Sequence, residues 1–118
     1  MRKTARIAIA GALTGAALLG VAGNAAASNT YIKGAYAYYD PNKHMFGLGD
    51  TEPDGNSVFI EWWADGVKQG RITNSRGNGK WKDVVIDSGL WGQPLRWRVC
   101  VDISWDLDRC SGYMQETA

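Results

Sequence analysis

Acidic side chains within residues 50–61 have the spacing of a calcium-binding loop. Asp50, Glu52 and Asp54 stand at alternate positions and Gly55 follows them. A fourth carboxylate, Glu61, stands where such a loop carries its bidentate ligand. Calcium takes about six to eight oxygen ligands from a flexible loop, so these residue types suit the ion. However, Gly47 and Gly49 interrupt any helix before the loop, and residues 57–64 have the pattern of a strand. Calcium binding therefore competes with an ordinary solvated acidic turn.

Exposed aromatic side chains are the second kind of candidate. Alternation within residues 57–64 places Phe59 and Trp63 on one face of the strand together with Glu61. The other face, with Val58, Ile60 and Trp62, is the one expected to join the core. An exposed aromatic ring can anchor a sugar or a protein partner, because it buries a large area at low entropic cost. Burial as part of a small core is the competing interpretation. Four residues are predicted to bind a ligand, two on that face and two in loops: Phe59, Trp63, Trp91 and Trp105.

Catalytic groups are sparse in this sequence. His44 is the single histidine and follows the predicted turn at residues 40–43. The sequence has no nucleophile motif and no cysteine near His44 that this histidine could activate as a base. Carboxylate pairs for glycoside hydrolysis could be drawn from Glu61, Asp83 and Asp87, but any acidic protein offers such pairs. We therefore expect binding rather than enzyme activity.

The first 27 residues are predicted to be a secretion signal. Basic residues open the chain, residues 7–21 are apolar, and small residues end at Ala27. The apolar stretch is short for a membrane-spanning helix, which needs roughly 20 strongly apolar residues. Cleavage is expected before Ser28, with cleavage after Ala25 as the alternative, so the product should be secreted and extracellular without stable membrane insertion.

Residues 28–118 are expected to form one domain, because 91 residues are too few for two. Without the three basic residues of the signal, 10 Lys and Arg face 12 Asp and Glu, a formal net charge of about −2. A slightly acidic domain has no electrostatic reason to bind nucleic acid or anionic lipid. An unidentified protein or glycan is the expected partner.

Cys100 and Cys110 are expected to form a disulfide, because their number is even and an exported protein meets oxidising conditions. Closing so short a loop should stabilise the fold by roughly 2–3 kcal/mol. Two thiols without further cysteine or histidine nearby do not suit a metal site. We expect no cofactor, apart from calcium at the acidic loop.

The chain alternates β-branched or aromatic runs with turn residues, and no stretch keeps a helical period. This pattern predicts an all-β fold: a small antiparallel β-sandwich of about six strands, with a partly open barrel as the alternative. The expected strands cover residues 31–39, 57–64, 67–73, 80–87, 95–103 and 109–114. A site is sought first in the loops 40–56, 74–79 and 88–94.

Two local patterns give more detail. Asp65-Gly66 supplies two residues that tolerate positive φ, so it predicts a tight hairpin turn between the second and third strands. Residues 95–103 alternate strictly, with five apolar residues on the face predicted to be buried: Leu95, Trp97, Val99, Val101 and Ile103. The disulfide should therefore lie on the opposite, outer face and brace the last hairpin.

Residues 50–58, 95–102 and 109–113 resemble a family of small secreted actinobacterial proteins of unknown function. The resemblance covers most of the chain after the signal, and its motifs mark turns and a cystine. Members often carry a second cysteine pair, one of them just before the acidic turn, where Leu48 and Gly49 stand here. The resemblance implies a secreted β-sandwich and no activity.

The sequence thus favours a secreted, non-catalytic binding module that uses exposed aromatic side chains to hold a cell-wall glycan or a protein. A structural or envelope-associated protein without a discrete ligand is one alternative, and a calcium-stabilised extracellular module is the other. A contiguous exposed aromatic patch would favour binding, whereas scattered, buried rings would favour a scaffold.

Overall fold

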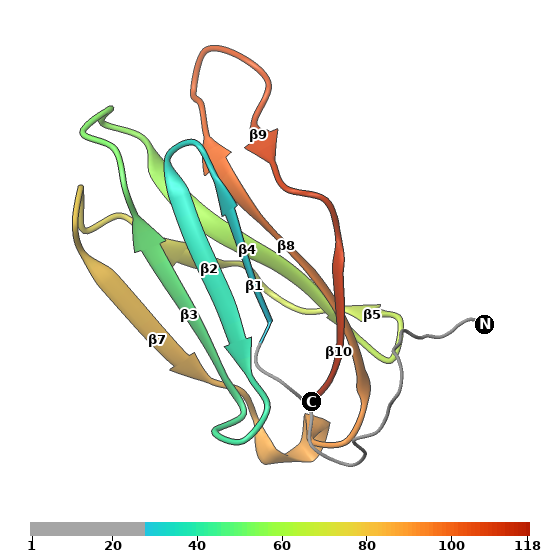
Figure 1. Ribbon diagram of the computed structural model, residues 1–118. Helices are drawn as coiled ribbons and strands as arrows, with labels where there is room; N and C mark the ends of the chain where they lie inside the picture. Colours follow the sequence, from blue (N-terminus) through green and yellow to red (C-terminus); the bar gives the residue numbers. More distant parts are fainter. Residues whose placement is uncertain (1–27) are drawn as a thin grey trace, which may run out of the picture.

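The computed structural model describes residues 28–118, which form two antiparallel β-sheets packed face to face (Figure 1). Sheet A has the strand order β1-β2-β3-β7, with bounds Ser28–Ile32, Ala35–Asp40, Met45–Asp50 and Trp81–Val85. Sheet B has the order β10-β8-β4-β5, with bounds Met114–Thr117, Pro94–Asp102, Ser57–Ala64 and Val67–Lys68. Two short strands extend sheet B, since β6 (Ile72–Asn74) pairs with β4 and β9 (Arg109–Cys110) pairs with β8. The prediction of an all-β sandwich is confirmed.

The core lies between the sheets and is built from the inward residues of each strand. Phe46 of β3 is its centre, with ring centroids 4.8 Å from Tyr39, 5.3 Å from Trp62 and 5.5 Å from Trp97. The predicted buried face of β4 is confirmed, as are four of the five predicted positions of β8; these seven buried residues are Val58, Ile60, Trp62, Leu95, Trp97, Val99 and Val101. Ile103 follows the end of β8 and is only half-buried.

The predicted hairpin and disulfide are both present. Asp65 and Gly66 have φ values of 49° and 78°, and they join the antiparallel strands β4 and β5. Cys100 and Cys110 are bonded and link β8 to β9. Cys100 is nevertheless fully buried, although it points away from the core between the sheets.

The predicted number of strands is wrong, because residues 28–118 contain ten. The segment predicted as one strand at 31–39 is the β1–β2 hairpin, which turns at Gly34 with φ of 101°. The predicted loop 40–56 contains β3, the segment 67–73 contains β5 and most of β6, and the segment 109–114 contains β9 and only the first residue of β10. Glycine and short turns inside these segments permit reversals that strand propensity alone does not show.

Asn74 ties the two sheets together on the side of β6. Its buried amide nitrogen donates to the carbonyl oxygens of Leu48 and Lys80, each at 3.0 Å, and its carbonyl oxygen accepts from the backbone N–H of Arg76 at 3.0 Å. This single side chain therefore fixes β6 of sheet B against β3 of sheet A and orders the loop that leads into β7.

Candidate functional site

The outer face of sheet A carries a row of aromatic side chains. Register places Tyr31 beside Tyr36, Tyr36 beside Gly49, and Gly49 beside Trp81, so these four positions cross all four strands on one face. A second row crosses the same strands through Asn29, Tyr38, Gly47 and Asp83. The aromatic face is defined here as the outward side chains Tyr31, Tyr36, Tyr38 and Trp81.

Two glycines of β3 allow the rings to lie against the sheet. A Cβ on Gly47 would stand 2.3 Å from the Tyr38 ring, and one on Gly49 would stand 3.0 Å from the Trp81 ring. Each ring thus occupies the space that a side chain of β3 would fill, with one ring face packed on backbone. The other ring face is turned away from the sheet.

The remaining rings border this surface. Tyr36 meets Trp81 almost at right angles, 81° at a centroid distance of 5.7 Å, and Tyr31 meets Tyr36 edge-on at 6.4 Å. Tyr38 and Trp81 are 6.2 Å apart with an interplanar angle of 40°. Tyr31 is 61% exposed and Trp81 45%, so the rings form a contiguous surface that is open to solvent.

Polar groups lie among these rings. The Tyr38 hydroxyl donates to Asp83 Oδ1 at 3.2 Å across Gly47. Burial, and then the charge and hydrogen bond of Asp83, raise the pKa of Tyr38, which keeps the hydroxyl protonated. The charged residues whose side chains point outward from the strands of sheet A are Asp40 and Asp83, so this face carries no strand-borne positive charge.

The four aromatic residues predicted from the sequence do not share one surface. Phe59 lies on the outer face of sheet B as predicted, but the Arg71 guanidinium covers its ring. The guanidinium carbon is 3.9 Å from the ring centroid, and Phe59 is only 2% exposed. The predicted exposure of Phe59 is therefore wrong. The ring of Trp91 stacks on the ring of His44, with 3.8 Å between the ring centroids. Trp105 is 82% exposed and lies in the loop between β8 and β9.

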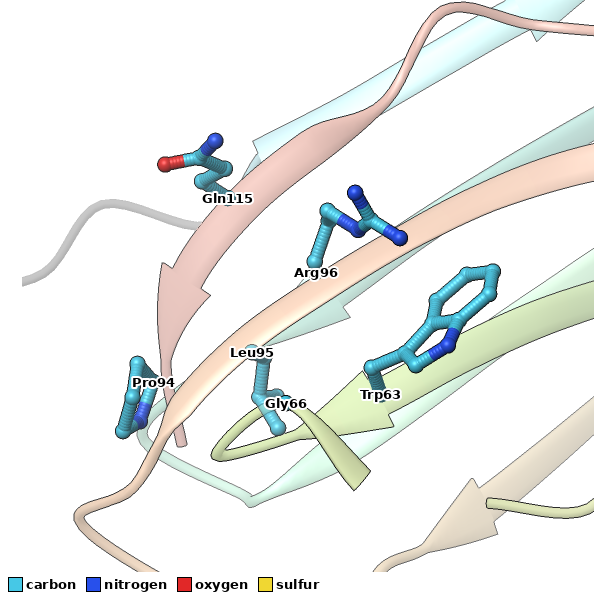
Figure 2. Close-up of a pocket in the computed structure, with 6 residues that line it drawn as sticks. All are labelled: Trp63, Gly66, Pro94, Leu95, Arg96 and Gln115. Carbon is cyan, nitrogen blue, oxygen red and sulfur yellow. The ribbon is translucent and has the colours of Figure 1, made fainter. Parts of the chain in front are cut away.

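Trp63, the fourth predicted residue, lies on the outer face of sheet B at one end of β4. Register places it in a row with Gln115, Arg96 and Lys68. Around it is a groove of about 400 Å³ (Figure 2), lined by Trp63, Gly66, Pro94, Leu95, Arg96 and Gln115. We call this the sheet B groove.

Arg96 is the charged side chain of this groove. Its guanidinium carbon lies 4.5 Å from the ring centres of both Trp63 and Tyr113. Neither of the two ion pairs found within residues 28–118 involves Arg96. Its charge is thus held by aromatic rings and stays available to an anionic group from outside.

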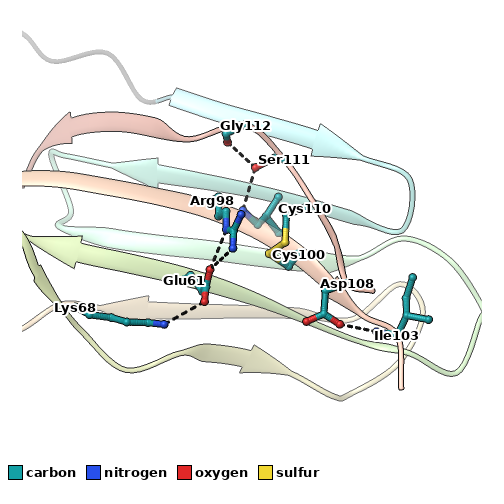
Figure 3. Close-up of a disulfide and its surroundings, with 10 residues drawn as sticks. Glu61, Lys68, Arg98, Cys100, Ile103, Asp108, Cys110, Ser111 and Gly112 are labelled. Carbon is teal, nitrogen blue, oxygen red and sulfur yellow. Dashed lines mark hydrogen bonds and ion pairs between the residues drawn. A yellow bond between two sulfur atoms is a disulfide. The ribbon is translucent and has the colours of Figure 1, made fainter. Parts of the chain in front are cut away.

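The predicted calcium ligands are not brought together. Asp50 and Asp54 accept hydrogen bonds from the backbone of their own turns, at Glu52 and Asn56. Glu61 lies on the outer face of sheet B and pairs with Arg98 at 2.8 Å and Lys68 at 3.2 Å (Figure 3). Within residues 28–118, no three His, Cys, Asp or Glu side chains are grouped to hold a metal ion.

Glu61 is an ion-pair centre in this fold. Burial opposes its ionisation, but the hydrogen bonds and charges of Arg98 and Lys68 outweigh burial and hold the pKa of Glu61 below its usual range. Its pairing as a glycosidase carboxylate with Asp83 is excluded by position, because the two lie on the outer faces of opposite sheets. Stacked sheets are about 10 Å apart, beyond the roughly 5–9.5 Å that such pairs need.

His44 and Asp87 have local structural roles. His44 has a positive φ of 51° in the turn between β2 and β3, and its ring stacks on Trp91 with an interplanar angle of 9°. Asp87 caps the 3₁₀ turn Ser88–Leu90 by accepting from the Gly89 N–H at 3.1 Å. Both contacts order the loop at the end of β7.

The residues of the aromatic face were missed by sequence reasoning. The available signal was the alternation of Phe46 and Leu48 with Gly47 and Gly49, which is a strand pattern with empty outward positions. The alternation Tyr36, Ala37, Tyr38 on the neighbouring strand β2 is the second signal, since it places both tyrosines on one face.

The predicted signal peptide, residues 1–27, lies outside the described residues. No helix among residues 28–118 is long and apolar enough to cross a membrane, and the disulfide indicates an oxidising environment. No protein-family model, curated protein or solved structure matches the chain. The resemblance to small secreted actinobacterial proteins therefore stays a prediction. The candidate binding surfaces are the aromatic face of sheet A and the sheet B groove.

Proposed function

We propose that the protein is a secreted, non-catalytic glycan-binding module whose ligand lies on the aromatic face of sheet A. The observation that carries the proposal is the row from Tyr31 to Trp81, which crosses all four strands of sheet A and passes over the outward glycines Gly47 and Gly49 of β3. The rings are contiguous and half-buried or exposed, which is the arrangement expected of a contact surface.

Sugar rings suit this surface for a physical reason. The face of an aromatic ring is electron-rich, so it attracts the C–H groups that line one side of a pyranose. Tyr38 and Trp81 each have one ring face packed on glycine and the other turned outward. Tyr36 stands almost perpendicular to Trp81 and supplies a side wall. Asn29 and Asp83, in the row beside them, are placed to exchange hydrogen bonds with sugar hydroxyls.

The charge of the face selects among glycans. Its outward strand residues carry two carboxylates, Asp40 and Asp83, and no Lys or Arg. The Arg76 guanidinium, which donates to the Trp81 carbonyl oxygen at 2.7 Å, offsets part of this charge at the β7 edge. The two carboxylates still disfavour a polyanionic chain and do not oppose a neutral polysaccharide. We therefore infer a neutral glycan of the cell wall or extracellular matrix as the ligand. The predicted signal peptide and the disulfide fit an encounter outside the cytoplasm.

The test is retention of the purified protein on neutral polysaccharides. Insoluble cellulose and chitin serve as pull-down probes, and soluble glucans serve in affinity electrophoresis and tryptophan fluorescence. Replacing Trp81 by Ala should weaken binding by about tenfold or more, because a stacked aromatic anchor contributes at least about 1.4 kcal/mol. Tyr36→Ala should weaken it by a smaller factor, since this ring forms only the wall.

Trp91→Ala is the matched control, because Trp91 has the same exposed fraction of 45% and lies outside the aromatic face. Its affinity should equal that of the unmodified protein. Equal losses for Trp81→Ala and Trp91→Ala, or no retention on any neutral polysaccharide, would refute the proposal. Retention on polyanions that disappears at high salt would assign glycan binding to the basic residues of sheet B instead.

A further inference from the structure

The loop between β8 and β9, residues 103–108, exposes two large apolar side chains. Trp105 is 82% exposed and Leu107 87%, the highest values among the large hydrophobic residues that the structure describes as exposed. Figure 1 shows this loop projecting beyond the ends of the neighbouring strands. Side chains of this kind at a projecting tip are typical anchors for a partner.

The loop is held in a defined shape. The backbone N–H of Ile103 donates to Asp108 Oδ1 at 3.1 Å, and the N–H of Asp106 donates to the Ile103 carbonyl at 3.3 Å. The disulfide between Cys100 and Cys110 closes its base (Figure 3). Little conformational entropy is therefore lost when the loop docks, which favours binding by a preformed tip.

The loop is also acidic. Asp106 and Asp108 lie within it, and Asp102 precedes it at the end of β8 on the outer face of sheet B. Three carboxylates beside two apolar side chains require a partner that offers an apolar hollow with positive charge at its rim. An anionic membrane surface does not meet this requirement, because it would repel the carboxylates.

The sheet B groove has these complementary properties. Trp63, Pro94 and Leu95 supply apolar lining, and its volume of about 400 Å³ is within the range of small-ligand sites, enough for one indole. Arg96 at its rim is exposed and has no ion pair with a carboxylate of residues 28–118. Lys68 and Arg98 nearby share a single carboxylate, Glu61, and Asp65 precedes the groove residue Gly66. Three cations and two carboxylates therefore leave a net positive charge around the groove.

Loop and groove lie at opposite ends of one strand. Arg96 is near the start of β8, which runs for nine residues from Pro94, and the loop follows its end at Asp102. Nine residues of strand span about 30 Å, so the loop cannot reach the groove of its own chain. Only a second molecule can bring the two surfaces together.

We propose that the protein self-associates head to tail, with Trp105 and Leu107 of one copy docked in the sheet B groove of the next. Asp106 and Asp108 of the inserted loop face Arg96 of the receiving copy. The contact is heterologous, so one end copy of a growing chain keeps a free loop and the other a free groove, and the assembly grows as an open chain unless its rotation closes a ring.

The assembly should be weak and sensitive to salt. A contact made by one loop buries less than the roughly 1,200 Å² of a standard interface, which is the size class of weak, transient encounters. The aromatic face of sheet A is not used, so a chain of copies would present several such faces to one polysaccharide and gain avidity.

Sedimentation of the purified protein from about 10 µM to 1 mM provides the first test. The average mass should rise with concentration at low salt and fall when salt is added, because the Arg96 contact is screened. Two variants should stay monomeric at every concentration: the loop variant Trp105→Ser/Leu107→Ser and the groove variant Arg96→Glu. Val85→Ser is the control, since Val85 is 62% exposed on the outer face of sheet A, and should associate normally.

Mixing the two variants provides the decisive test. The loop variant keeps a working groove and the groove variant keeps a working loop, so the mixture should form 1:1 dimers and nothing larger. Arg96→Gln serves as a second groove variant if Arg96→Glu melts at a lower temperature than the unmodified protein. A constant monomer mass of the unmodified protein, a mixture that stays monomeric, or an association lost in Trp81→Ala and kept in both variants would overturn the proposal. Loss of glycan binding in Trp81→Ala tests the aromatic face and leaves this result unaffected.

Discussion

Replacement of Glu116 by Gln should stabilise the protein at pH 8 and leave its stability near pH 4 almost unchanged. Glu116 lies on β10 with its side chain on the core side, where Trp97 Nε1 donates to Glu116 Oε2 at 3.2 Å. Burial raises the pKa of this carboxyl from 4.5 to about 7, although the Trp97 hydrogen bond opposes the change. The folded state therefore binds a proton more tightly than the unfolded chain does.

The sign of the pH dependence follows from this difference. Below pH 4.5 both states are protonated and the favourable contribution is fully present; it is lost as the pH rises through about 7. Each pKa unit corresponds to about 1.4 kcal/mol, so the loss is at most about 3 kcal/mol. The carboxyl keeps some access to solvent, which reduces this value. Glutamine can still accept the Trp97 hydrogen bond and carries no charge.

Thermal and urea unfolding between pH 4 and pH 8 provide the measurement. At pH 8 the variant should gain about 2–3 kcal/mol, which for a domain of this size raises Tm by roughly 10 °C or more. Glu52→Gln, in the acidic loop, controls for the loss of one negative charge. Parallel pH curves for Glu116→Gln and the unmodified protein would show that burial of this carboxyl does not affect stability.

Reduction of the disulfide and two substitutions test the fold further. Reduction of the Cys100–Cys110 disulfide should lower the free energy of unfolding by about 2–3 kcal/mol, measured by urea denaturation with and without reductant. Gly47→Val should lower the free energy of unfolding by about 1–3 kcal/mol, because the new Cβ would stand 2.3 Å from the Tyr38 ring. Adding Tyr38→Ala to the same chain removes this overlap and should recover part of the loss. Asn74→Ala should lower the free energy of unfolding by roughly 1–3 kcal/mol in a melting experiment, since it removes the side-chain donor to the Leu48 carbonyl and one of two donors to the Lys80 carbonyl, which keeps the Asp50 N–H at 3.3 Å.

Local patterns in the sequence were enough to predict parts of sheet B. Strict alternation in residues 95–103 identified the buried face of β8, and Asp65-Gly66 identified the β4–β5 turn, because both depend on neighbouring residues only. The pairing of Cys100 with Cys110 followed from their number. These features need no knowledge of how distant segments pack.

Sheet A was harder to predict because its pattern depends on other strands. Gly47 and Gly49 lower the strand propensity of β3, so the sequence predicts a loop where the structure has a strand. Their role is visible only when Tyr38 from β2 and Trp81 from β7 are placed over them. The partner strand β7 follows β6 in sequence and yet pairs with β3, so the aromatic face combines residues far apart in the chain.

The glycines of β3 argue that the aromatic face serves contact with another molecule. Glycine within a strand costs roughly 0.5–1 kcal/mol relative to alanine, so Gly47 and Gly49 together cost about 1–2 kcal/mol. A sheet face that served stability alone would carry β-branched residues at these positions, with small or polar residues in place of Tyr38 and Trp81. The chain instead has large rings turned to solvent over empty positions. Packing of these rings on the glycines offsets part of that cost. The opposite ring faces, which are turned to solvent, add no such stability and suit the proposed stacking of a sugar.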